Sequence, residues 1–154
     1  MSSENMIEIN NLTTDSIDKE FLKKIVKKVL KEEKREKENL SIALIGPNRM
    51  RELNRIYRGK NRVTDVLSFP GVKALKAELK IKSLERIEGL GEIVICLREV
   101  KKNARKLSSS FESELIFCLI HGVLHLLGYE HEKSEVEAEK MEEKQQYYFS
   151  KVFS

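Results

Sequence analysis

Long hydrophobic runs, cysteines and histidines are scarce in this sequence. Its 154 residues include two cysteines, two prolines and three histidines. No stretch approaches the roughly 20 apolar residues of a membrane-spanning helix. The first residues, MSSENMIEINN, lack the basic and apolar regions of a secretory signal peptide. We therefore expect a soluble, cytoplasmic protein with no membrane partner.

The cysteines and the chain length indicate a single domain in a reducing environment. Cys96 and Cys118 each lie inside an apolar run, where a free thiol behaves as a small hydrophobic side chain. A chain of 154 residues can bury most of its unfolded surface around one core. Residues 1–154 are therefore interpreted as one domain, and no internal repeat divides them.

Neither sign of charge dominates. The chain has 29 basic and 25 acidic residues, a formal net charge of +4 and a pI near 9.0, so the basic excess alone does not identify an anionic partner. The placement of the arginines is more informative. At about 100° per residue, the helical segment RMRELNRIYR places Arg51, Arg55 and Arg58 on one stripe. The opposite face carries the residues expected to pack: Met50, Leu53, Ile56 and Tyr57.

Apolar periodicity predicts strands alternating with helices. The predicted strands span residues 6–12, 40–46, 63–70 and 90–97, and the predicted helices span 16–30, 49–58, 98–107, 109–127 and a segment from 134. Expected capping residues are Asn48, Gly59, the capping box Ser109–Glu112, Gly128 and the capping box Ser134–Glu137. The helix from residue 134 carries a thinner apolar stripe that includes Val136, Met141 and Tyr148. Residues 71–89 receive no assignment.

All three histidines lie in HGVLHLLGYEH, at the end of a helix that is apolar on nearly every side and is therefore expected to be buried. His121 and His125 are four residues apart and share one helix face, and Gly128 lets the chain turn so that His131 can supply a third nitrogen. Zinc binds such nitrogens at about 2.0–2.1 Å, and three ligands leave a fourth position for water.

A buried histidine with satisfied hydrogen bonds is the alternative to a metal ligand. Three imidazoles beside leucines, without partners, would cost on the order of 1–3 kcal/mol for each unsatisfied group, and coordination removes that cost. The spacing therefore favours a metal site, for which zinc, nickel and copper are all suitable.

The histidine spacing resembles the zinc motif of metzincin peptidases, with one departure. Those enzymes carry a glutamate after the first histidine as the proton acceptor, and Gly122 occupies that position here. A different substrate is indicated. Phosphodiester cleavage fits, because a metal ion and an arginine together stabilise the negative charge of its transition state.

Three segments, ELNRIYRGKNRVTDVLSFP, LGEIVI and HGVLHLLGYEH, resemble the motifs of the YbeY family of bacterial endoribonucleases and ribosome maturation factors. The resemblance implies an α/β (α+β) fold, a mixed sheet of about four strands flanked by about five or six helices, with the metal site on the central buried helix. It also implies one zinc ion on His121, His125 and His131, and a cleft lined by Arg58. The implied activity is metal-dependent cleavage of single-stranded RNA, linked to maturation of the 3′ end of 16S ribosomal RNA and to ribosome quality control.

The resemblance selects Arg58 as the functional arginine, whereas Arg51 and Arg55 are either phosphate contacts or ordinary surface residues. Asp65 either orients a ligand or makes a turn contact, and Ser68 either lines the cleft or is structural. Two glutamates, Glu92 and Glu130, replace the aspartates usual in the family, so any hydrogen bond to a ligand there needs a longer side chain.

The leading hypothesis is a zinc-dependent endoribonuclease in which His121, His125, His131 and Arg58 are catalytic, and either water or the ribose 2′-hydroxyl attacks. We expect a monomer that binds the small ribosomal subunit. One alternative is a non-catalytic RNA-binding assembly factor with structural zinc. Another is a metallohydrolase of a different substrate class.

Overall fold

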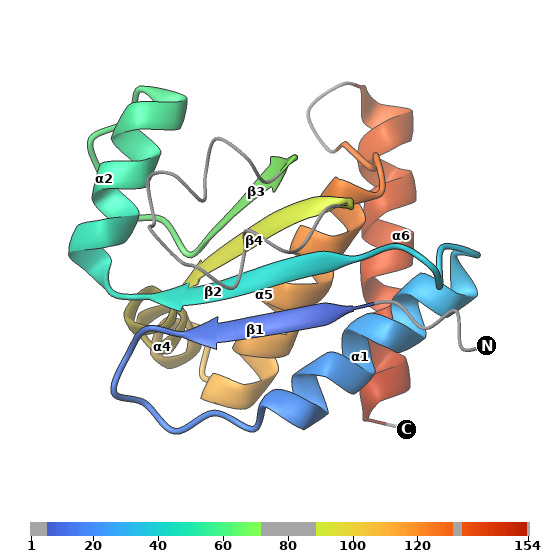
Figure 1. Ribbon diagram of the computed structural model, residues 1–154, viewed down its shortest axis with the longest axis horizontal. Helices are drawn as coiled ribbons and strands as arrows, with labels where there is room; N and C mark the ends of the chain where they lie inside the picture. Colours follow the sequence, from blue (N-terminus) through green and yellow to red (C-terminus); the bar gives the residue numbers. More distant parts are fainter. Residues whose placement is uncertain (1–5, 72–88, 131–133, 154) are drawn as a thin grey trace.

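Four strands form a mixed sheet at the centre of the computed structural model, which describes residues 6–71, 89–130 and 134–153 (Figure 1). The strands are β1 (Ile7–Asn11), β2 (Leu40–Ile45), β3 (Val66–Pro70) and β4 (Gly91–Cys96), in the spatial order β1, β2, β4, β3. β1, β2 and β4 are parallel, whereas the edge strand β3 is antiparallel to β4. The predicted mixed sheet is confirmed.

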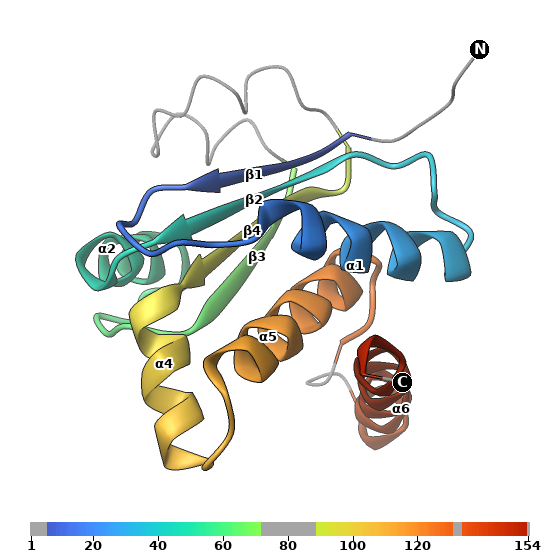
Figure 2. The same ribbon diagram turned by 90° about the horizontal axis from the view of Figure 1, so that it is seen from below.

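The helices of the described residues cover both faces of this sheet. They are α1 (Lys19–Glu32), α2 (Pro47–Arg58), α4 (Leu97–Lys106), α5 (Phe111–Leu126) and α6 (Glu135–Val152). Figure 2 shows α1 and α5 beneath one face, with α6 beyond α5. The opposite face packs against α2 through Met50 and Leu53. β2 and β4 are buried on both faces, as their nearly continuous apolar sequences predict.

The central buried helix is α5. Eight of its residues are buried, and they meet the sheet, α1, α4 and α6. Among the described helices, no single one has the length and apolar composition of a membrane span, and α4 and α5 meet those criteria only as a pair bent by 117°. The apolar character of α5 is explained by contacts within the protein.

Capping residues agree only in part with the sequence predictions. Ser134 caps α6 as predicted, and Gly59 has the left-handed conformation (φ 67°) that ends α2. The predicted caps of two other helices are wrong. α5 is capped by Ser110 rather than by the box Ser109–Glu112, and α2 begins one residue before Asn48 and has no side-chain cap.

Two residues predicted to pack are exposed. Ile56 on α2 is 42% exposed and Val136 on α6 is 73% exposed. On α2, Asn54 is buried beside Leu53, and its Nδ2 donates to the carbonyl of Arg62 at 2.9 Å. This hydrogen bond ties the loop that follows α2 to the helix, and it places the end of α2 beside the start of β3.

Candidate active site

His121 and His125 lie one turn apart near the end of α5, and their rings converge. Their Nε2 atoms are 3.1 Å apart and their ring centroids 4.6 Å apart. Both side chains are half-buried. The helix alone produces this pairing, because residues at i and i+4 lie one above the other on the same face. The structure thus brings together two of the three predicted ligands.

The convergent nitrogens fit a shared metal ion. Two ligands at about 2.0–2.1 Å from a tetrahedral zinc ion lie about 3.3 Å from each other. The observed separation of 3.1 Å is close to that value. The third predicted ligand, His131, lies outside the described residues and stays a prediction. Within the described ranges, no three His, Cys, Asp or Glu side chains are grouped as metal ligands.

A cavity of about 380 Å³ adjoins the histidine pair. It is bounded by the end of α2, the edge strand β3 and the end of α5. Its polar lining residues include Arg58, Asp65, Ser68, His121, His125 and Glu130. Segments that are far apart in the sequence therefore place a guanidinium group, two imidazoles and two carboxyl groups around one space.

The three arginines on the predicted stripe of α2 do not share one environment. All three side chains are exposed, but Arg58 lines the cavity whereas Arg51 and Arg55 do not. The position of Arg58 follows from its place in the last turn of the helix, next to the loop that leads into β3. Of these three arginines, Arg58 alone lies beside the histidine pair.

Asp65 anchors the cavity wall to two helices. Its Oδ2 accepts a hydrogen bond from Asn103 Nδ2 of α4 at 3.4 Å and one from Cys118 Sγ of α5 at 3.6 Å. Burial, together with the neighbouring Asp65 carboxylate, raises the pKa of the Cys118 thiol, which therefore stays protonated and can donate. Since Cys118 precedes His121 by one turn, Asp65 holds the wall against the helix that carries the histidines.

Ser68 and Gly122 determine how closely α5 approaches the sheet. Ser68 Oγ on β3 donates to the carbonyl of Gly122 at 3.3 Å. Gly122 faces β4, and a Cβ atom there would lie 2.8 Å from Ile93 Cγ2. Position 122, which carries the proton acceptor in metzincin peptidases, therefore points at the sheet and not into the cavity.

Replacing Gly122 by alanine is expected to destabilise the protein by about 1–3 kcal/mol, because the added methyl group overlaps Ile93. Urea unfolding of the variant measures this loss. Removing the obstructing atom with Ile93→Ala in the same chain should make the double variant more stable than the sum of the two single losses predicts. Strict additivity of the two losses would contradict the proposed overlap.

The two glutamates that depart from the family pattern lie in different places. Glu130 lines the cavity. Side chains two residues apart on a strand point to the same face of the sheet, so Glu92 lies on the same face of β4 as Val94. Val94 packs toward α2, and this face is opposite the one that contacts α5. A hydrogen bond from Glu92 to a histidine of α5 is therefore excluded. Sequence spacing could not reveal this, because it does not show which face of β4 meets α5.

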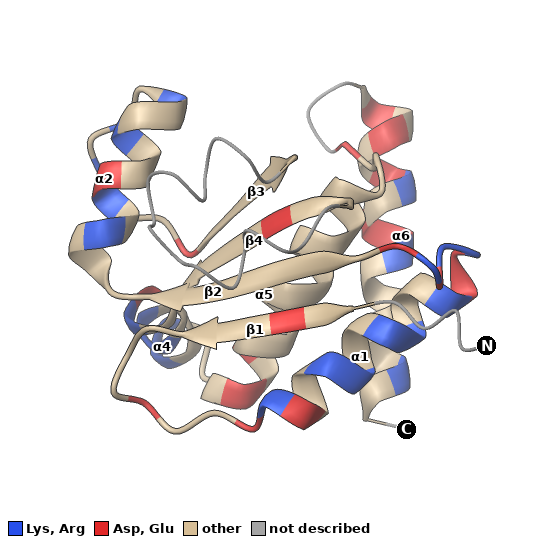
Figure 3. Ribbon diagram, in the orientation of Figure 1, with Lys and Arg blue, Asp and Glu red and all other residues tan. Residues whose placement is uncertain are grey.

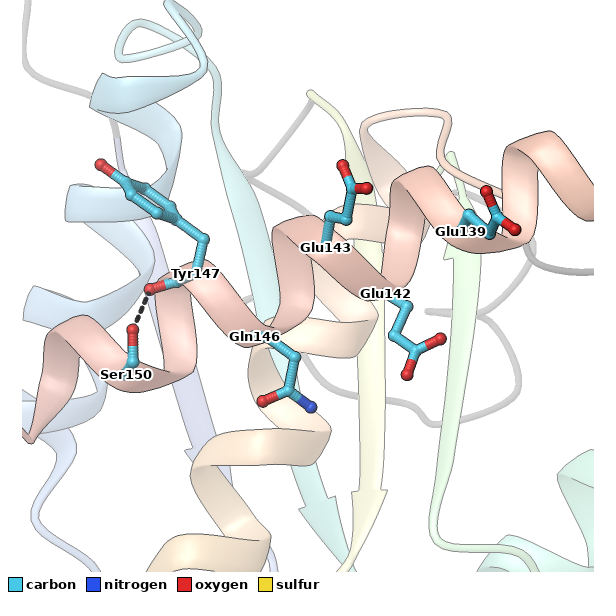
Figure 4. A pocket seen from close by; sticks show the side chains of 6 residues that line it. All are labelled: Glu139, Glu142, Glu143, Gln146, Tyr147 and Ser150. Carbon is cyan, nitrogen blue, oxygen red and sulfur yellow. Dashed lines mark hydrogen bonds between the residues drawn. The ribbon is translucent and has the colours of Figure 1, made fainter.

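Charge also distinguishes this cavity from a depression on α6. Figure 3 shows basic residues along α2 and acidic residues along much of α6. The depression on α6 is lined by Glu139, Glu142 and Glu143, whose side chains project outward from one helix (Figure 4). Three carboxylates repel phosphate groups, so the cavity beside Arg58 is the better candidate for a phosphodiester substrate.

Known proteins resemble the whole described fold. The family model "Endoribonuclease YbeY" matches residues 8–152. An "Endoribonuclease YbeY" of Persephonella marina is 42% identical over 139 residues, covering 89% of this chain and 86% of its own. One from a Sulfurihydrogenibium species is 36% identical over 152 residues, covering 98% and 95%. A solution structure of a Thermotoga maritima protein superposes with a TM-score of 0.65 at 32% identity, covering 96% of this chain and 89% of that one.

Proposed function

Because this chain belongs to the Endoribonuclease YbeY family, we propose that it cleaves single-stranded RNA in the cavity between α2, β3 and α5. The observation that carries the proposal is the convergence of His121 and His125, with Nε2 atoms 3.1 Å apart, in the same cavity as Arg58. Such a site can both hold a metal ion and bind an anionic substrate.

His121, His125 and His131 would hold a zinc ion, which when bound supplies positive charge that stabilises the phosphate in the transition state. Arg58 binds the same phosphate through paired N–H groups, which match the geometry of two nonbridging oxygens. Ser68 and Asp65 each make a hydrogen bond to α5, which holds β3 and α5 together as walls of the cavity. These walls orient the RNA strand.

The cavity also contains groups that can accept a proton from the attacking oxygen. Asp65 and Glu130 both line it. Oδ2 of Asp65 accepts hydrogen bonds from Asn103 and Cys118, and its Oδ1 accepts one from the Thr64 hydroxyl at 3.5 Å. Either a water molecule or the ribose 2′-hydroxyl is a suitable attacking group, and both must lose a proton to a base.

Arg58→Ala is expected to slow cleavage of a labelled single-stranded RNA about 100-fold, because a charged donor to the transition state is lost. Arg58→Lys should recover only part of the rate, since an ammonium group cannot make the paired contact. Arg55→Ala is the matched control on the same helix and should retain nearly the parent rate. Equal rates in the Arg58→Ala and Arg55→Ala variants would contradict the assignment of Arg58.

The biological setting belongs to the same proposal. We propose that the RNA is the precursor of 16S ribosomal RNA, cut during maturation of its 3′ end, and that the small ribosomal subunit is the partner of a monomeric, cytoplasmic enzyme. Cleavage of peptides without cleavage of RNA would favour another metallohydrolase. Binding of RNA without cleavage would favour an assembly factor.

A further inference from the structure

Glu33 joins three parts of the protein at a point remote in sequence from the histidines. It lies just after α1, and its side chain is 11% exposed. Its Oε1 accepts the Tyr129 hydroxyl at 2.6 Å, and its Oε2 accepts Lys144 Nζ at 3.0 Å and also the Tyr148 hydroxyl. The Glu33 carboxylate thus accepts hydrogen bonds from the turn after α5 and from α6.

The turn that contains Tyr129 also ends the helix of the histidine pair. The N–H of Gly128 donates to the carbonyl of His125 at 3.0 Å, and the N–H of Tyr129 donates to that of Leu124 at 3.0 Å. The next residue, Glu130, lines the cavity. The side-chain contact of Tyr129 with Glu33 therefore connects the end of α1 to the backbone beside the candidate site.

The charge of Glu33 strengthens this connection. Burial opposes ionisation of the carboxyl group, but hydrogen bonds from Tyr129, Tyr148 and Lys144 outweigh it and lower the pKa of Glu33. The group is therefore ionised near neutral pH, and hydrogen bonds to a carboxylate are about twice as strong as those between neutral groups.

We propose that Glu33 is a positioning residue for the metal site: by holding Tyr129, it fixes the turn after His125 and thereby the geometry with which the histidines bind zinc. This role rests on the proposed function. Groups that orient metal ligands without touching the metal change its affinity when they are removed, whereas a contact that only stabilises the fold does not.

Two tyrosines of this cluster provide a matched test. Tyr129→Phe and Tyr148→Phe each remove one hydroxyl group that donates a hydrogen bond to Glu33. Of these two tyrosines, only Tyr129 belongs to the turn after α5. Zinc affinity of each full-length variant is measured by competition with a chelator, and stability by urea unfolding. We expect Tyr129→Phe to weaken zinc binding at least about 10-fold, and Tyr148→Phe to leave zinc affinity unchanged although both variants lose stability.

Glu33 itself allows a rescue experiment. Glu33→Ala is expected to weaken zinc binding as Tyr129→Phe does. Glu33→Gln should restore part of the affinity, because the amide oxygen still accepts the Tyr129 hydroxyl. Equal zinc affinities for the Tyr129→Phe and Tyr148→Phe variants would overturn the positioning role while leaving the proposed function intact. Failure of the unaltered protein to bind zinc or cleave RNA would instead overturn the proposed function.

Discussion

Replacing His121 by alanine is expected to lower the rate of RNA cleavage about 1,000-fold. The substitution removes one of the two nitrogens that converge at 3.1 Å. A bound metal ion contributes several kcal/mol to stabilising a phosphoryl transition state, and each 1.4 kcal/mol corresponds to about a tenfold change in rate. Single-turnover cleavage of a labelled single-stranded RNA measures the loss.

Metal content and a second variant make this experiment decisive. Protein prepared without nickel resin is analysed for zinc, which should fall well below one ion per chain in the His121→Ala variant. His125→Ala should behave in the same way, and far-ultraviolet circular dichroism shows whether each variant is folded. If both folded variants cleave RNA as fast as the parent, a contaminating nuclease is responsible and the proposed function is wrong.

The second large effect concerns stability and depends on pH. Glu92 is fully buried on β4, and within the described part of the chain neither of its carboxyl oxygens has a hydrogen-bond partner. Burial, with a smaller contribution from the negative charge of Glu8, raises the pKa of Glu92 from 4.5 to about 8. The buried carboxyl group is therefore protonated in the folded protein at neutral pH.

The sign of the effect follows from comparing the folded and unfolded chains. Below pH 4.5 both carry the proton on Glu92, so its titration makes no pH-dependent contribution to stability. Between pH 4.5 and about 8 only the unfolded chain releases it, so the free energy of unfolding falls by about 1.4 kcal/mol per pH unit. Above that range the loss is complete and constant, at several kcal/mol.

Glu92→Gln should abolish this contribution and make the protein more stable than the parent at pH 8. Urea unfolding of both proteins between pH 4.5 and 9 measures the difference. Glu8→Gln is the matched control, because it removes the neighbouring charge but leaves Glu92 buried, and it should keep most of the slope. Parallel stability curves for the parent and the Glu92→Gln variant would show that Glu92 does not titrate in this range.

Three of the differences from the sequence analysis share a cause. The exposed Ile56 and Val136 and the inward-facing Asn54 depend on which neighbours a helix meets, whereas periodicity shows only that a helix has an apolar face. The positions of the strands and helices were predicted well, because that periodicity is local.

The sequence by itself determined the histidine pair, since the rise and twist of a helix bring His121 and His125 together whatever surrounds them. It also determined the mixture of strands and helices, through local apolar patterns. Only the tertiary structure decided that Arg58 shares their cavity while Arg55 does not, and that Glu92 faces away from it. These relations depend on how β3, α2 and α5 pack, because contacts between distant segments have no local pattern in the sequence.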